Sequence, residues 1–97
     1  MRLSKRLIRQ AGRQAFPIHR RLPRGATGAV EAALQFCLDG RREGATGPML
    51  YAHFMRRYFE LRPACSDVFC TACETSTARA QRLILACLEA IAGLEEP

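Results

Sequence analysis

A helical repeat in the last third of the chain, residues 66–94, constrains the fold more than any other feature of the sequence. Its members are small or apolar and lie alternately four and three residues apart: Ser66, Cys70, Cys73, Thr77, Ala80, Ile84, Cys87, Ile91 and Leu94. This spacing keeps residues on one face of an α-helix. We therefore predict one C-terminal helix about 43 Å long, at about 1.5 Å per residue, that serves as the packing spine of the domain. A break near residues 75–77 is the alternative.

The composition agrees with a fold made of helices. With 97 residues, the chain forms one domain with a modest core. Ala, Leu, Arg and Glu are abundant and β-branched residues are scarce, which favours helix over strand. Apolar residues also recur with helical spacing in residues 2–15, 28–39 and 48–61. We expect an all-α protein, a small bundle of about four helices with short connections.

Positive charge is concentrated at the N-terminus of the chain. Residues 1–24 contain eight Lys and Arg and no acidic residue, so this segment has a charge of +8, whereas residues 25–97 carry −2. We therefore expect two parts, a basic N-terminal helix and linker (residues 1–24) and a helical body (residues 25–97). Such asymmetry points to a polyanionic partner or an anionic surface. Because all basic residues but one are Arg, the bias of a GC-rich genome is an alternative explanation.

The basic segment suits three kinds of partner. Nucleic acid is the first, since Arg binds phosphate bidentately and with a strong dependence on salt. Six side chains are expected to contact it: Arg6, Arg9, Arg13, Arg20, Arg21 and Arg24. An anionic membrane surface and a mitochondrial import receptor are the others, because both bind basic amphipathic helices. A solvated helix face that binds nothing is the remaining alternative.

Residues 48–61 form the most aromatic segment of the chain and are apolar on almost every side. This helix is predicted to end before Pro63, because the residue before a proline avoids helical geometry. A domain of this size cannot easily cover every face of such a helix, so part of it suits an interface with another protein or a second copy. The candidate interface residues are Tyr51, Phe54, Met55, Tyr58 and Phe59. A helix at the centre of the core is the alternative.

The tetrapeptide Gly-Ala-Thr-Gly occurs twice, each time before a helical pattern. Its predicted role is to begin a helix, because Thr and Gly are favoured at helix N-caps and Pro48 suits the first helical position. The candidate caps are Thr27 or Gly28, and Thr46 or Gly47. Gly40 is expected to end the helix of residues 28–39. The resulting connection of about eight residues is too long for a helix-turn-helix motif, which has three or four.

Cys65, Cys70 and Cys73 form the cluster with the most suggestive chemistry. Three thiolates at this spacing, with His53 as the fourth ligand, make a candidate zinc site. The alternative is that Cys70 and Cys73 are small core residues of the helical repeat. Nothing in the sequence resembles a secretory signal, so the cysteines are expected to stay reduced. We expect no cofactor, with zinc on these four residues as the alternative.

The sequence contains no paired carboxylates, Ser–His–Asp set or Gly-rich phosphate loop placed as an active site requires, so we expect a protein that is not an enzyme. The leading hypothesis is a small binding or regulatory protein whose basic segment contacts nucleic acid with little sequence specificity. The alternatives are a helical protein-interaction module (an adaptor, inhibitor or chaperone-like subunit) and a small zinc-binding protein. No apolar run approaches the roughly 18 residues of a membrane span. We expect the protein in the cytoplasm or with the nucleoid, with mitochondrial targeting by residues 1–24 as the alternative.

Overall fold

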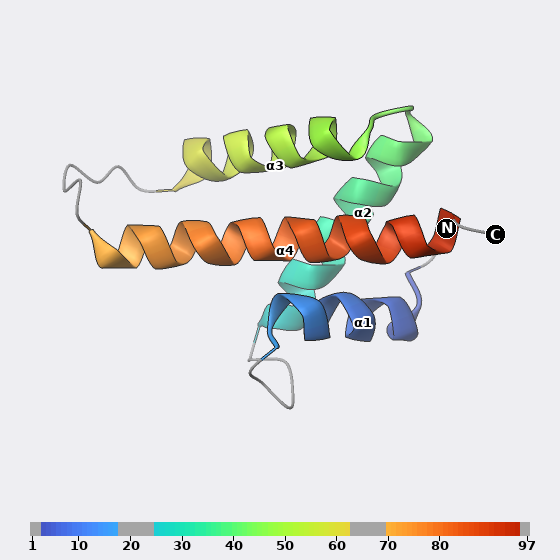
Figure 1. Ribbon diagram of the computed structural model, residues 1–97, viewed down its shortest axis with the longest axis horizontal. Helices are drawn as coiled ribbons and strands as arrows, with labels where there is room; N and C mark the ends of the chain where they lie inside the picture. Colours follow the sequence, from blue (N-terminus) through green and yellow to red (C-terminus); the bar gives the residue numbers. More distant parts are fainter. Residues whose placement is uncertain (1–2, 18–24, 63–69, 96–97) are drawn as a thin grey trace.

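A computed structural model describes residues 3–17, 25–62 and 70–95, which form four α-helices (Figure 1). These are α1 (Lys5–Ala15), α2 (Ala26–Arg42), α3 (Gly47–Leu61) and α4 (Thr71–Glu95). No strand occurs in the described part of the chain. The prediction of a small all-α bundle is confirmed.

The helix α4 is the element against which the other three pack. The helices α1 and α3 lie along opposite sides of α4 and run antiparallel to it, while α2 crosses behind (Figure 1). The described helices α1 and α3 contact α4 but not each other. The predicted role of the C-terminal helix as packing spine is therefore confirmed.

The C-terminal helix is continuous from Thr71 onwards, so the alternative of a break near residues 75–77 is wrong. The Thr77 hydroxyl donates to the carbonyl oxygen of Cys73 at 2.8 Å, which satisfies this polar side chain within the helix. The backbone N–H of Glu74 donates to the carbonyl oxygen of Cys70 at 3.1 Å and closes the first turn. The predicted start at Ser66 lies outside the described residues.

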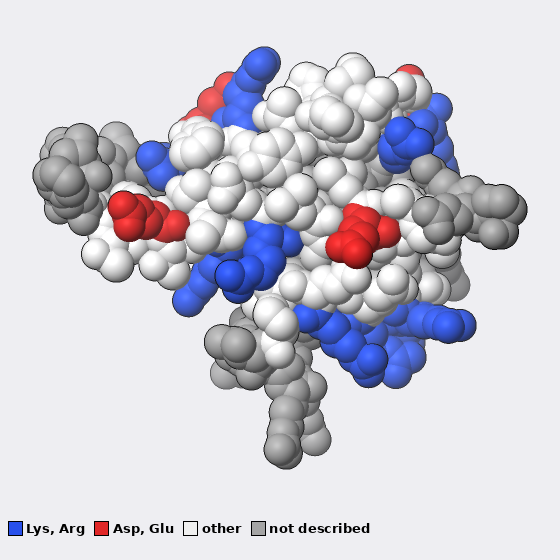
Figure 2. Space-filling model, in the orientation of Figure 1, with Lys and Arg blue, Asp and Glu red and all other residues white. Residues whose placement is uncertain are grey.

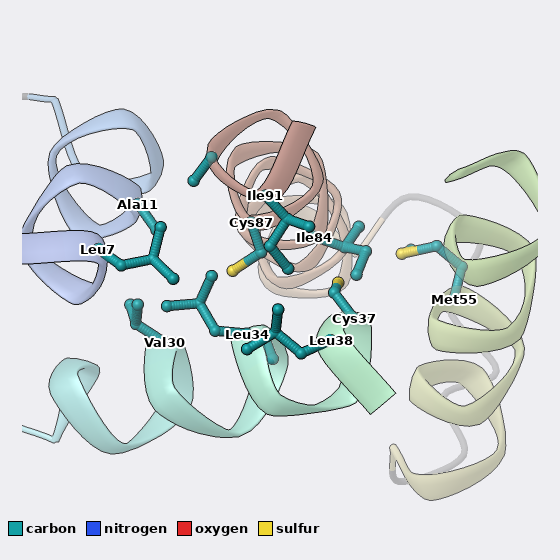
Figure 3. Close-up of a cluster of buried hydrophobic side chains, with 12 residues drawn as sticks. Leu7, Ala11, Val30, Leu34, Cys37, Leu38, Met55, Ile84, Cys87 and Ile91 are labelled. Carbon is teal, nitrogen blue, oxygen red and sulfur yellow. The ribbon is translucent and has the colours of Figure 1, made fainter. Parts of the chain in front are cut away.

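The core lies where α1, α2 and α4 meet, with Met55 of α3 at its edge (Figure 3). The largest side chains that are almost completely buried are Leu34, Ile84, Val30, Cys37 and Cys87. They come from the predicted apolar faces of residues 28–39 and 66–94, so both helical patterns identified core positions correctly. Leu94, the last member of the repeat, is 56% exposed because it lies in the final turn of α4.

The two halves of α4 have different surroundings. In Figure 1, α1 and α2 lie beside the C-terminal half of α4, while α3 runs along its middle, with the start of α3 near Leu88 and Ile91. Polar contacts among the described residues join α3 and its C-cap to α4. Gln81 Nε2 donates to Tyr51 Oη at 3.1 Å, an Arg62 N–H donates to Thr77 Oγ1 at 3.2 Å, and the hydroxyls of Tyr58 and Ser76 share a hydrogen bond.

The prediction that Gly40 ends the second helix is wrong, because α2 continues through Gly40 to Arg42. Gly40 is instead a site of close packing. A Cβ atom on Gly40 would lie 2.2 Å from Cδ2 of Leu50, a side chain that is only 3% exposed. A larger residue at this position would therefore require the Leu50 side chain to shift.

The connection between α2 and α3 is consequently shorter than expected. It comprises residues 43–46, so its length no longer argues against a helix-turn-helix motif. Gly44 adopts φ +90°, the left-handed conformation in which glycine is unstrained.

The two Gly-Ala-Thr-Gly segments begin helices in different ways. Thr46 Oγ1 accepts from the Met49 N–H at 3.4 Å, as predicted, while Pro48 is the second residue of α3, one position later than expected. Neither Thr27 nor Gly28 caps α2, which starts one residue after Gly25 with no side-chain cap. The cap prediction is thus right for the second segment and wrong for the first.

Candidate nucleic-acid interface

The helix α1 is fixed to the body of the protein by one narrow face. Ser4 caps it, with Oγ accepting from the Leu7 N–H at 3.1 Å. Leu7, Ala11 and Ala15 are 5%, 0% and 4% exposed, and Leu7 and Ala11 belong to the common core. Because two of these residues are Ala, their small side chains let α1 pack closely against α4 and α2.

The opposite face of α1 carries four exposed basic residues, Lys5, Arg6, Arg9 and Arg13, which we call the basic face of α1. No acidic residue occurs in the helix. The long side chains enclose a shallow hollow of about 410 Å³, lined by Arg6, Arg9, Gln10, Arg13 and Gln14. Figure 2 shows Lys and Arg side chains gathered where Figure 1 draws α1, with no Asp or Glu between them.

This face has the chemistry and the spacing to bind a row of anions. Along the helix, Arg6 and Arg9 are about 4.5 Å apart and Arg9 and Arg13 about 6 Å apart, at about 1.5 Å per residue. Each guanidinium presents a planar fork of donors that fits two oxygens of a phosphate or carboxylate. Glutamines flank the arginines, so neutral hydrogen-bonding groups are also available.

The structure places three of the six predicted nucleic-acid contacts together, namely Arg6, Arg9 and Arg13 on the basic face of α1. The other three, Arg20, Arg21 and Arg24, lie outside the described residues.

Two further arginines belong to the helix that α1 packs against. Arg79 and Arg82 are exposed on α4, and Figure 2 shows basic side chains over the middle of that helix. Both side chains are accessible to solvent, but neither was among the predicted contacts with nucleic acid.

Most of the candidate protein-interface residues of α3 make contacts within the chain instead. Met55 is 6% exposed, and Tyr51 and Tyr58 are half-buried with their hydroxyls bonded to α4. The ring of Phe54 lies 6.0 Å from that of Phe36 on α2. Only Phe59 of the five is exposed, at 48%.

The candidate zinc ligands are dispersed, as far as the structure describes them. His53 is exposed on α3, whereas Cys70 and Cys73 are half-buried at the start of α4. Within residues 3–17, 25–62 and 70–95, no three His, Cys, Asp or Glu side chains lie close enough together to hold a metal ion. Cys65 lies outside these ranges, so the zinc site that includes it stays a prediction.

Two other cysteines are core residues. Cys37 on α2 and Cys87 on α4 are both completely buried (Figure 3). Burial raises the pKa of Cys37 to about 11. Burial, with a smaller contribution from Cys37, raises the pKa of Cys87 to about 12. Both thiols are therefore protonated at neutral pH and contribute to packing.

None of the protein-family models, curated proteins or solved structures compared with this chain matches it. None of the described helices is both long and apolar enough to cross a lipid bilayer. Two surface features of the described residues are candidates for binding, namely the basic face of α1 and the exposed apolar residues near the end of α3.

Proposed function

We propose that the protein binds nucleic acid without catalysing a reaction, and that the basic face of α1 holds the phosphate backbone. One observation carries this proposal. The apolar side of α1 is buried in the core, so Arg6, Arg9 and Arg13 are presented outwards together on a rigid, acid-free surface. A fixed row of guanidinium groups suits the repeating charge of a nucleic-acid backbone.

The burial of α1 also favours nucleic acid over the two other partners considered for this segment. A helix that lies in a membrane surface, or in the groove of an import receptor, must present its apolar side to the partner. Here Leu7 and Ala11 are only 5% and 0% exposed, and they contact α2 and α4 instead. The charged side of α1 is the one that remains available.

Binding of this kind would carry little sequence specificity. Contacts to phosphate fix a protein on its target but do not distinguish bases. The basic face contains Arg and Lys, with Gln10 and Gln14 at its border, and no aromatic residue that would stack on a base. A regulatory or architectural role in the cytoplasm or on the nucleoid fits such a protein.

A protein-interaction module is the second candidate function, and one observation favours it. Phe59 and Leu61 of α3 are 48% and 72% exposed, and exposed aromatic and aliphatic side chains suit an interface with another protein. The two candidates use different helices and do not exclude each other.

The test replaces Arg6, Arg9 and Arg13 by Gln in the full-length chain and measures affinity for labelled single- and double-stranded oligonucleotides. Truncation before Gly25 is unsuitable, because it would also remove Leu7 and Ala11 from the core. Each of the three exposed contacts contributes up to about 1 kcal/mol to binding. Their combined loss should therefore reduce the affinity for the oligonucleotide about 10- to 100-fold.

The matched control replaces Arg42, Arg56 and Arg57 by Gln. All three are exposed on α2 or α3, so the control changes the net charge equally but leaves α1 intact. We expect the control to bind nearly as tightly as the wild type. Equal losses in both variants, or no binding by the wild type at low salt, would refute the proposal.

A further inference from the structure

The C-terminal half of α3 has a side that no other described helix covers. Contacts between α2 and α3 lie in the N-terminal half of α3, where Gly40 meets Leu50 and Phe36 meets Phe54. Beyond Phe54, the described part of the chain places only α4 beside α3 (Figure 1). The side of α3 that α2 covers near its start is therefore open towards its end.

An apolar groove of about 400 Å³ occupies this position, which we call the α3 groove. It is lined by Phe54, Arg57, Tyr58, Leu61 and Arg62. Leu61 is 72% exposed, the highest value for any large hydrophobic residue in the described part of the chain. Burial of such a side chain against a partner contributes about 1.5–3 kcal/mol to the free energy of binding.

The border of the α3 groove is positively charged. Among the described residues, its lining includes Arg57 and Arg62 and no acidic residue. Arg62 is held in place on two sides, because it donates to Thr77 Oγ1 at 3.2 Å and its guanidinium lies 4.8 Å from the centre of the Phe59 ring. A guanidinium carries five N–H donors, so the bond to Thr77 leaves it capacity for a carboxylate.

We infer that the α3 groove binds an amphipathic helix of a partner protein, with apolar side chains against Phe54 and Leu61 and carboxylates beside Arg57 and Arg62. A helix fits because Phe54, Tyr58 and Leu61 are spaced four and three residues apart and form a ridge on one face of α3, against which a further helix can pack. No strand edge is present in the described residues to pair with an extended peptide. Acidic side chains fit because both charged residues of the lining are Arg. The basic face of α1 from a second copy would be repelled.

The test uses a defined probe, a labelled synthetic helical peptide of about 18 residues with one Leu stripe and Glu on both flanks of the stripe. Fluorescence anisotropy measures its binding to the full-length protein. We expect saturable binding that Leu61→Asp weakens by at least about tenfold, since one buried Leu accounts for about that factor. Arg57→Glu should weaken binding as well, because it inverts a charge at the border.

Two matched controls test whether the peptide binds at the α3 groove. Leu85→Asp changes an equally large residue of α4 that is 53% exposed, and Arg56→Glu inverts a charge outside the groove lining on α3. Both should bind the peptide like the wild type, and so should the Arg6, Arg9 and Arg13 variant.

Four results would overturn the inference: no saturable binding, equal affinity for a peptide with Lys in place of Glu, equal loss in the controls, or self-association that Leu61→Asp abolishes. The last result would identify a second copy as the occupant. None of them bears on the binding of nucleic acid by α1.

Discussion

Replacement of Gly40 by Ala should destabilise the protein, although the same change stabilises most helix interiors. Gly40 lies inside α2, where Ala is favoured over Gly by about 1 kcal/mol. The added Cβ would lie 2.2 Å from Cδ2 and 3.3 Å from Cγ of Leu50. Leu50 is 3% exposed, so its side chain must leave a packed position to admit the added atom.

The magnitude follows from two opposing contributions. Overpacking of a core position costs about 1–3 kcal/mol, against the helix gain of about 1 kcal/mol. We expect a net loss of about 1 kcal/mol in the free energy of unfolding, which corresponds to a fall in Tm of about 4–8 °C for a chain of this size. Urea unfolding followed by circular dichroism measures the difference.

A double-mutant cycle with Leu50→Ala tests whether the effect of Gly40→Ala depends on its contact with Leu50. That background removes the atoms that clash, so Gly40→Ala should there raise the free energy of unfolding by about 1 kcal/mol. If Leu50→Ala, which costs about 2–5 kcal/mol, leaves too little folded protein, Leu50→Val serves as the background. Gly28→Ala is the control in the same helix, because nothing lies within 4 Å of its added Cβ, and it should stabilise. A stabilising Gly40→Ala in the wild-type background, or the same effect in both backgrounds, would refute the packing role of Gly40.

Two further predictions concern the core and the helix caps. The pKa values of Cys37 and Cys87 are raised from 9.0 to about 11 and about 12, so the unfolded chain loses these protons first as the pH rises. Stability should be unaffected by these thiols below pH 9.0 and should fall above it by up to about 1.4 kcal/mol per pH unit and thiol. Urea unfolding of the wild type and Cys37→Ala across that range measures this, and an identical slope in both would contradict it. Thr46→Ala should destabilise by about 0.5–1 kcal/mol through loss of the cap on α3, whereas Thr27→Ala should have little effect, since α2 has no side-chain cap. Equal effects in thermal unfolding would show that the two segments start their helices alike.

Helical periodicity predicted most of the fold from the sequence. The repeat that includes Ile84, Cys87 and Ile91 identified the buried face of α4 before any contact was known. Such patterns succeed because one buried face is a local property of a helix. Gly40 shows where they fail, because a glycine at the end of an apolar pattern suggests a helix stop, while its close contact with Leu50 depends on how α2 and α3 cross.

The candidate sites were predictable to a smaller extent. The sequence identified Arg6, Arg9 and Arg13 as one basic helix face, but the burial of Leu7 and Ala11 that makes this face rigid required the structure. The aromatic residues of α3 illustrate the opposite case. A helix that is apolar on every side does not indicate which side its neighbours will cover, so the exposed Leu61 was not among the expected interface residues.

The dependence of nucleic-acid affinity on salt tests the central proposal most directly. Each phosphate contact with duplex DNA contributes about −0.9 to the slope of log affinity against log salt concentration. If Arg6, Arg9 and Arg13 each contact a phosphate, their replacement by Gln should make the slope shallower by about 2.7. Raising the salt from about 50 to about 200 mM should then reduce the affinity of the wild type about 40-fold more than that of the variant. Parallel slopes for the two proteins would show that the basic face of α1 does not hold the phosphate backbone.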